Sequence, residues 1–167
     1  MNLEDALMEE HSKAQREKIV NYIGNNKERF AELMKLFFNG PYRLTQRAAW
    51  PLSYCTQNHP SLITPYLKRL IDNLGKPGMH DAVIRNTVRL LQYVTIPEKF
   101  HGQVMTTCFN FIQSNETAAA IKAFSLTILQ NLAKQYPEIL PEIRTIIEER
   151  WEHETAAFRS RARKLMG

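Results

Sequence analysis

The side chains that could take part in catalysis or metal binding are scattered along this sequence instead of forming motifs. None of the five histidines belongs to an HExxH pair or stands at zinc-ligand spacing from a cysteine. Each is expected at its own helix end or turn: His11, His59, His80, His101 and His153. The histidine pattern therefore predicts no metal site.

Motifs for nucleophilic or phosphate chemistry are also missing. The sequence contains no G-x-S-x-G elbow and no G-x-G-x-x-G loop, and residues 75–78 (Gly-Lys-Pro-Gly) are typical of a turn. Glu148 with Glu149, and Glu152 with Glu154, could form acid pairs, but we interpret all four as solvated on a polar C-terminal helix. We predict no catalytic residues, no cofactor and no enzyme activity.

The cysteines and the overall composition indicate an ordinary reduced globular chain. Cys55 and Cys108 fall on the apolar sides of predicted helices without CxxC spacing, so we expect buried, reduced thiols. With 167 residues, 44% of them hydrophobic, and no Ser/Gly linker, we expect a single domain over residues 1–167. The sequence has no apolar run of membrane-spanning length and starts with acidic residues, so we expect no membrane segment and a cytoplasmic location.

Charge is the feature that points to a partner. The formal net charge is +5, and residues 13–112 hold fourteen Lys and Arg against six Asp and Glu. Lys68 and Arg69 lie on one predicted helix and Arg89 on another, where they could present a basic stripe to phosphates or to an acidic protein. We take these three as candidate partner-binding residues. A merely solvated face is the alternative.

An internal repeat organises the chain from residue 41 onward. Arg47, Arg85 and Lys122 recur at steps of 38 and 37 residues, and each is followed by a hydrophobic helical stretch. About a dozen residues later, a proline opens a second helix in each copy: Pro60, Pro97 and Pro137. The repeat predicts helix pairs that stack on one another, and a closed bundle of the same helices is the alternative.

Hydrophobic spacing predicts helices throughout and no strand. A helix over residues 3–23 and a second one ending near residue 39 form a divergent opening repeat. Three pairs and a last helix follow, over residues 43–57 with 61–74, 80–93 with 97–113, 116–135 with 137–151, and 155–166. Pro51 lies inside the first of these helices, where we expect a kink.

These residues give the chain a resemblance to the HEAT-repeat family. Asp81 precedes Ile84-Arg85, Glu116 precedes Ile121-Lys122, and Pro51 interrupts a first helix, although no acid precedes Arg47. The resemblance implies an all-α, short right-handed superhelix of about four antiparallel helix pairs plus a C-terminal helix. It also implies a non-catalytic scaffold or adaptor that binds a protein or peptide.

Within this family, the repeated cations are expected to serve structure. The resemblance implies that Arg47, Arg85 and Lys122 form an internal ladder, in which each cation bonds an acid or a helix-end carbonyl of the next repeat. The cations of the last helix are different, and we expect a solvated tail there or a docking site for the acidic residues 4–10 of another copy. The cations of the last helix are Arg159, Arg161, Arg163 and Lys164. The oligomeric state stays open.

A second hypothesis is nucleic-acid binding. The DNA alkylation repair proteins resemble HEAT stacks and use a tryptophan, a carboxylate one turn on and an arginine about one repeat later. This chain has Trp50 and Arg89, but Tyr54 stands in place of the acid. The resemblance therefore implies nucleic-acid binding without glycosylase activity, and Trp50 is otherwise expected to be a core residue.

Overall fold

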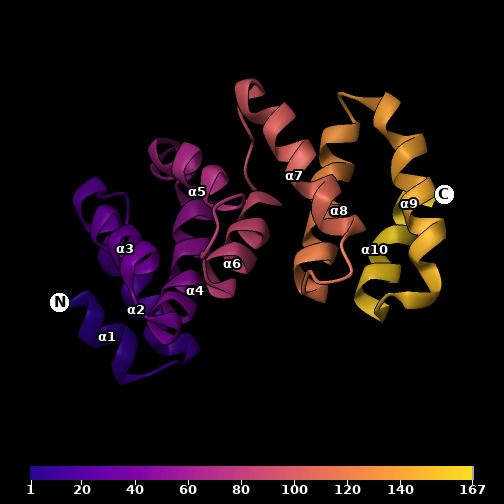
Figure 1. Cartoon of the computed structure of the whole chain (residues 1–167). Helices are drawn as coiled ribbons and strands as arrows, with labels where there is room; N and C mark the ends of the chain where they lie inside the picture. Colours follow the sequence, from indigo (N-terminus) through magenta and orange to yellow (C-terminus); the bar gives the residue numbers. More distant parts are fainter. Residues whose placement is uncertain (167) are drawn as a thin grey trace. The chain divides into compact units, whose positions relative to one another are not determined.

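The computed structural model describes residues 1–166, and this part of the chain is helical with no strand (Figure 1). The all-α prediction is confirmed. The helices are α1 (Leu3–Glu9), α2 (Lys13–Ile23), α3 (Lys27–Asn39), α4 (Tyr42–Asn58), α5 (Leu67–Asn73), α6 (Asp81–Leu91), α7 (His101–Gln113), α8 (Ala119–Ala133), α9 (Leu140–Arg150) and α10 (Ala156–Met166).

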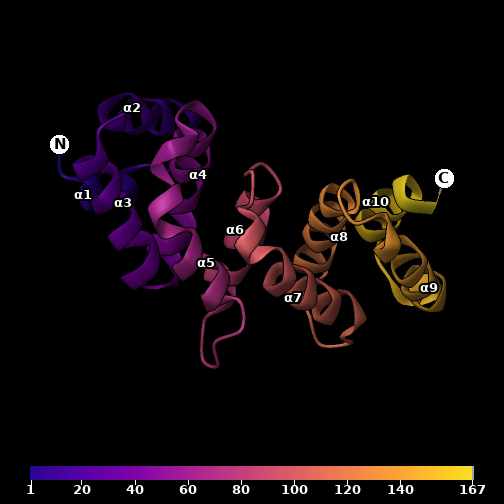
Figure 2. The ribbon, with the colours of Figure 1, turned by 90° about the horizontal axis from the view of Figure 1, so that it is seen from above.

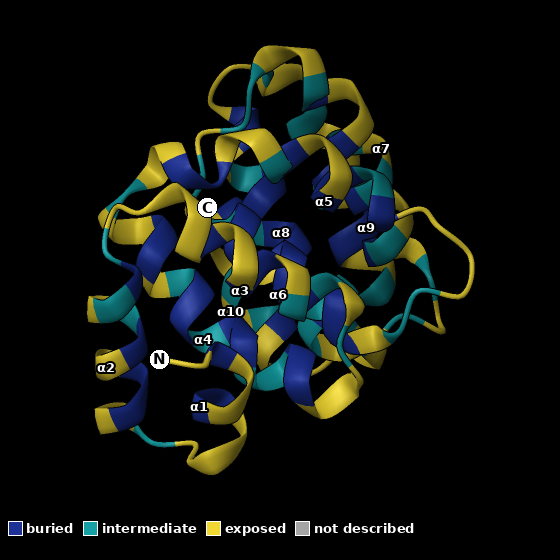
Figure 3. Ribbon diagram, turned by 90° about the vertical axis from the view of Figure 1, so that its left-hand side faces the viewer, coloured by how far each residue is buried: buried dark blue, intermediate teal, exposed yellow. Residues whose placement is uncertain are grey.

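The contacts divide the chain into two compact units, residues 1–86 and residues 87–167, and α6 crosses the boundary. Each unit has its own buried core, and Figure 3 colours the buried positions dark blue. The expectation of one domain over the whole chain stays a prediction.

The core of the first unit is built around α4. This helix packs against α1, α2 and α3 (Figure 2). Ala48 and Leu52 of α4 are buried, as are Leu33 and Phe37 of α3. Its N-terminus is tied to the preceding helix because the Thr45 hydroxyl donates to the Phe37 carbonyl at 2.9 Å. The proline predicted to kink the helix, Pro51, is buried within it, and the helix continues to Asn58.

The prediction of one helix over residues 3–23 is wrong, because the chain breaks between α1 and α2. Glu10 has extended backbone angles, and the Ser12 side chain caps α2 by accepting from the Gln15 amide at 3.1 Å. The Gln15 side chain in turn donates to the buried Ala6 carbonyl at 2.7 Å, which holds α2 against α1. A serine three residues before a glutamine is a start signal for a helix, and it was available in the sequence.

The prolines predicted to open second helices instead introduce short 3₁₀ turns. These turns are η1 (Pro60–Leu62), η2 (Thr64–Tyr66), η3 (Glu98–Phe100) and η4 (Pro137–Ile139), and η5 (Trp151–His153) follows α9. Proline suits the first turn of a helix because it has no N–H to leave unpaired. The helix predicted over residues 61–74 is therefore confined to α5.

The core of the second unit is built around α8, which lies between α7 and α10 (Figures 1 and 2). Nine residues of α8 are buried, including Ser125, Leu126 and Leu129. Phe158 of α10 is also fully buried. A helix buried over such a wide arc is packed between neighbours.

Burial should keep both thiols chemically silent. Cys55 and Cys108 are free and buried as predicted, and desolvation raises the pKa of each to about 12, although a hydrogen bond from Ser125 partly opposes the rise at Cys108. Since the thiolate is the reactive form, Ellman's reagent at mildly alkaline pH should label neither cysteine in the native protein and both in denaturant. Equal rates in the two states would contradict the burial.

Gly40 should tolerate no side chain. A Cβ built at Gly40 lies 2.6 Å from the Leu36 carbonyl oxygen and 2.9 Å from Leu44 Cδ2, so the α3–α4 connection would have to move. We expect Gly40→Ala to lower the free energy of unfolding by about 1–3 kcal/mol. Gly102→Ala is the matched control because no atom lies within 4 Å of its Cβ. Urea denaturation measures both, and equal stability of the two variants would argue against the close approach.

Candidate functional site

Two of the three repeated cations lie in the first unit, and both bond differently from the predicted ladder. Arg47 donates to the carbonyls of Leu7 at 3.1 Å and Met8 at 2.9 Å, at the end of α1. Arg85 pairs with Asp81 of its own helix at 2.8 Å and donates to the Tyr42 hydroxyl at 3.2 Å. The expectation that each cation bonds the following repeat is therefore wrong for these two.

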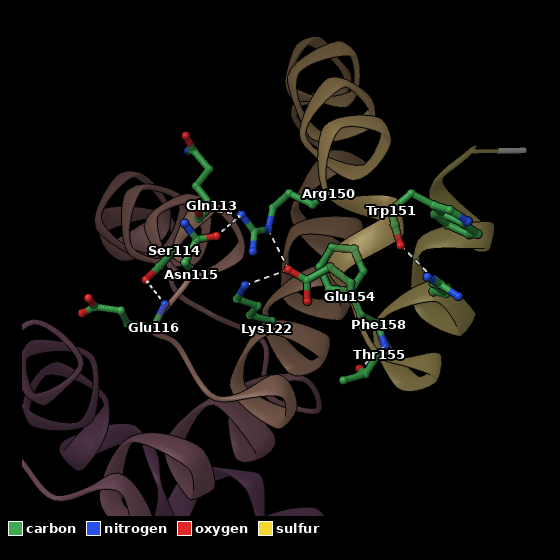
Figure 4. A network of polar contacts seen from close by, with 11 residues as sticks. Gln113, Ser114, Asn115, Glu116, Lys122, Arg150, Trp151, Glu154, Thr155 and Phe158 are labelled. Carbon is green, nitrogen blue, oxygen red and sulfur yellow. Dashed lines mark hydrogen bonds and ion pairs between the residues drawn. The ribbon is translucent and has the colours of Figure 1, made fainter.

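The third repeated cation, Lys122 of α8, does bond an acid further along the chain. Its ammonium lies 2.7 Å from Glu154 Oε1, and both side chains are 4% exposed. The same oxygen accepts from Arg150 Nε at 2.6 Å (Figure 4). One buried carboxylate is therefore shared by two cations, which we call the Glu154 network.

The Glu154 network joins three segments of the second unit. Arg150 also donates to the carbonyl of Gln113, the last residue of α7, at 3.2 Å and to Asn115 Oδ1, in the loop between α7 and α8, at 3.0 Å (Figure 4). The interpretation of Glu154 as a solvated acid is wrong, whereas Glu148, Glu149 and Glu152 are exposed as expected. Lys122, the partner of Glu154, lies 32 residues away along the chain, so no local sequence pattern could indicate this pair.

Arg159 also has a structural role that the sequence analysis missed. It follows Lys122 by 37 residues, which is the repeat step, and it occupies the first turn of α10. Its Nε donates to the Trp151 carbonyl at 2.9 Å, so its side chain is bonded to the preceding turn and is not simply solvated. Extending the repeat by one more step would have identified it. Docking of the last helix onto another copy stays a prediction.

The three candidate partner-binding residues fall in different units. Lys68 and Arg69 are exposed on α5 in the first unit, where Lys68 pairs with Asp72 at 2.7 Å and the Arg69 guanidinium lies 3.9 Å from the centre of the Phe38 ring. Arg89 is exposed in the second unit. The structure therefore brings Lys68 and Arg69 together but does not place Arg89 with them.

Arg89 belongs to a cluster of its own. Its guanidinium and that of Arg161 each lie 5.2 Å from the centre of the Phe124 ring of α8. We call these three residues the Phe124 cluster. No ion pair involves either arginine within the described residues, so both charges are held over a ring and remain available to an external anion.

Trp50 is packed by groups of its own unit. The Arg16 guanidinium lies 4.9 Å from the Trp50 ring centre and 3.9 Å from that of Tyr54, and its side chain is only 10% exposed. The His11 ring lies 5.0 Å from Trp50. Trp50 is therefore partly buried beneath Arg16, as a packing residue, and Arg89 of the nucleic-acid hypothesis lies in the other unit.

A pocket of about 310 Å³ lies in the second unit, between the segment after α6 and the C-terminal half of α8. Its lining includes apolar Ile128 and Leu132 together with the amides of Gln92 and Gln135. His101 closes one side, with Nε2 2.7 Å from the Ile96 carbonyl and Nδ1 2.9 Å from the Tyr136 hydroxyl. The pocket offers hydrogen-bonding groups around an apolar floor.

Within residues 1–166, no three His, Cys, Asp or Glu side chains gather in a way that could hold a metal ion. Among the same residues, every helix is too short or too polar to cross a bilayer.

The Glu154 network should be essential to the second unit. Removing a buried anion leaves Lys122 without its counter-charge, so we expect Glu154→Gln to cost about 3–5 kcal/mol of unfolding free energy. Glu152→Gln, at an exposed neighbour, should change little. Replacing Lys122 and Glu154 together by methionine should recover part of the loss. Urea unfolding followed by circular dichroism tests this, and a Glu154→Gln variant as stable as the wild type would refute it.

Comparison with known proteins agrees with this architecture. The family model described as a HEAT repeat domain matches residues 3–166, almost the whole chain. No curated protein and no solved structure matches the sequence. The match confirms the resemblance seen in the repeated residues and extends it to the opening helices, and the helical structure without strands agrees with an all-α HEAT-like solenoid. The chain belongs to the HEAT-repeat family.

Proposed function

We propose that the protein is a non-catalytic scaffold or adaptor that holds a protein or peptide partner on its helical surface. Membership of the HEAT-repeat family supports a role in protein interaction, because stacked helix pairs expose long helical surfaces to partners. Function does not follow from fold alone, so the proposal needs a surface feature of this chain.

The Phe124 cluster is that feature. Arginine and aromatic residues are enriched at protein interfaces and are over-represented among the residues that dominate binding energy. Arg89 and Arg161 are held over Phe124 and have no acidic partner within the described residues. Stacking on a ring restricts the rotamers of both side chains before a partner arrives, which lowers the entropic cost of binding.

Lys68 and Arg69 remain proposed secondary contacts. The Lys68 side chain is 75% exposed, and its pair with Asp72 is a surface pair within one helix, which contributes little. A partner carboxylate could therefore compete for Lys68 at small cost. We also propose that the chain acts without catalysis or cofactor and in the cytoplasm, in line with the sequence pattern.

Affinity capture from native host lysate tests the scaffold proposal. We expect a protein partner that stays bound after nuclease treatment and at raised ionic strength, because interfaces with a desolvated aromatic centre depend less on salt than phosphate contacts do. A titration of fluorescent duplex DNA at low and high salt runs in parallel. Salt-sensitive duplex binding with no captured protein would favour the nucleic-acid alternative instead.

A further inference from the structure

The Phe124 cluster and the 310 Å³ pocket lie on one face of α8. Phe124, Ile128 and Asn131 follow one another at steps of four and three residues, which places them along a single side of α8. Gln135 lies in the turn just beyond the end of α8 and lines the same pocket as Ile128 and Asn131. We call these four residues the α8 strip. Phe124 carries the two arginines at one end, and the other three residues line the pocket.

The C-terminal end of α6 and the segment that follows it run beside this strip. Arg89 approaches Phe124, and the Asn131 amide donates to the Gln92 carbonyl at 3.1 Å, so the two segments touch at both positions. Tyr93, which is 65% exposed, stands at the rim of the pocket, while Leu91 and Ile128 are buried at its floor. An exposed tyrosine beside an apolar floor is an arrangement that a partner side chain can cover.

Charge is segregated along the same helices. Neither α8 nor α10 contains an Asp or a Glu, and neither does the part of α6 in the second unit. All eight acids of residues 87–167 lie on α9, on 3₁₀ turns or in loops, against ten Lys and Arg. The charged side chains of α8, α10 and this end of α6 are therefore all cations, although the unit as a whole is close to neutral.

This arrangement suits an acidic peptide better than a nucleic acid. Nucleic-acid sites neutralise many phosphates with a broad basic surface. Here two arginines meet over one ring, and the rest of the strip presents amide groups and an apolar floor. Side-chain amides both donate and accept, so Asn131 and Gln135 can pair with the main chain of an extended peptide.

The length of the strip sets the spacing of the peptide. The step from Phe124 to Asn131 is seven residues, or roughly 10 Å at the helical rise. A chain in the extended polyproline II conformation covers that distance in about three residues, and its side chains three residues apart lie on the same face. We propose that the α8 strip binds an extended acidic segment of a partner protein, with a carboxylate between Arg89 and Arg161 and an apolar or aromatic side chain about three residues away in the pocket. This inference rests on the proposed scaffold function.

Selection of a phage-displayed random nonapeptide library on the full chain tests the inference. We expect selected peptides to be enriched in Asp or Glu about three positions from an apolar or aromatic residue. Synthetic fluorescent copies should bind the double variant Arg89→Gln, Arg161→Gln at least tenfold more weakly, the loss expected for contacts to charged groups. The variant Asn131→Ala, Gln135→Ala should also weaken binding.

The matched control is Lys134→Gln with Lys164→Gln, which removes the same charge from the C-cap of α8 and from α10, at exposed positions outside the strip. It should bind within about threefold of wild type, because surface charges act weakly at a distance. Circular dichroism establishes that each variant is folded. Equal weakening by both double variants would overturn the inference in favour of general charge attraction.

The remaining outcomes separate the two proposals. Selected peptides without acids, or peptides that bind the Arg89 and Arg161 variant unchanged, would overturn the α8 strip while leaving the scaffold function intact. Competition by single-stranded DNA, or by a second copy of the chain in sedimentation, would assign the strip to that occupant and overturn the peptide. If the selection yields no peptide and the lysate yields no captured protein, both proposals fail.

Discussion

The second unit depends on one buried carboxylate. Glu154 lies almost without solvent beside Lys122 and Arg150, and a buried charge is tolerated only when partners replace the water it has lost. The geometry of those partners fixes the N-terminal half of α8, the end of α9 and the start of α10 relative to one another, and Arg150 extends the constraint to the loop after α7. In the first unit, Arg47 has a comparable role for the end of α1. Stacked helices gain their stability from neighbours, so such cross-links determine which faces meet.

Two groups of cations in this chain therefore have different roles. Arg47, Lys122, Arg150 and Arg159 bond carbonyls or acids within their own unit, and their charge is used by the fold. Arg89 and Arg161 rest on an aromatic ring and have no acidic partner among the described residues. A net charge of +5 does not distinguish these groups, although, of the two, only the second leaves its charge open to a partner. The functional proposals follow from this difference.

The sequence could predict the helices because apolar spacing and proline position are local signals. It could also place the three cations in register, and the family match over residues 3–166 agrees with that repeat. It could not predict which way each cation reaches, because Arg47 bonds backward, Arg85 within its helix and Lys122 forward. Glu154 was misjudged because its partner Lys122 lies 32 residues away along the chain, so no local pattern distinguishes it from the exposed Glu152. The Phe124 cluster joins α6, α8 and α10, so only the folded chain displays it.

Hydrogen exchange with and without bound partner tests the central claim most directly, because it maps the contact surface without mutation. We expect a bound partner to slow amide exchange in the segments that carry Arg89, Tyr93 and the exposed strip residues Asn131 and Gln135. Exchange in α5 and α9 should change much less. Protection confined to α9, or to α5 with Lys68 and Arg69, would contradict the assignment of the partner to the acid-free helices.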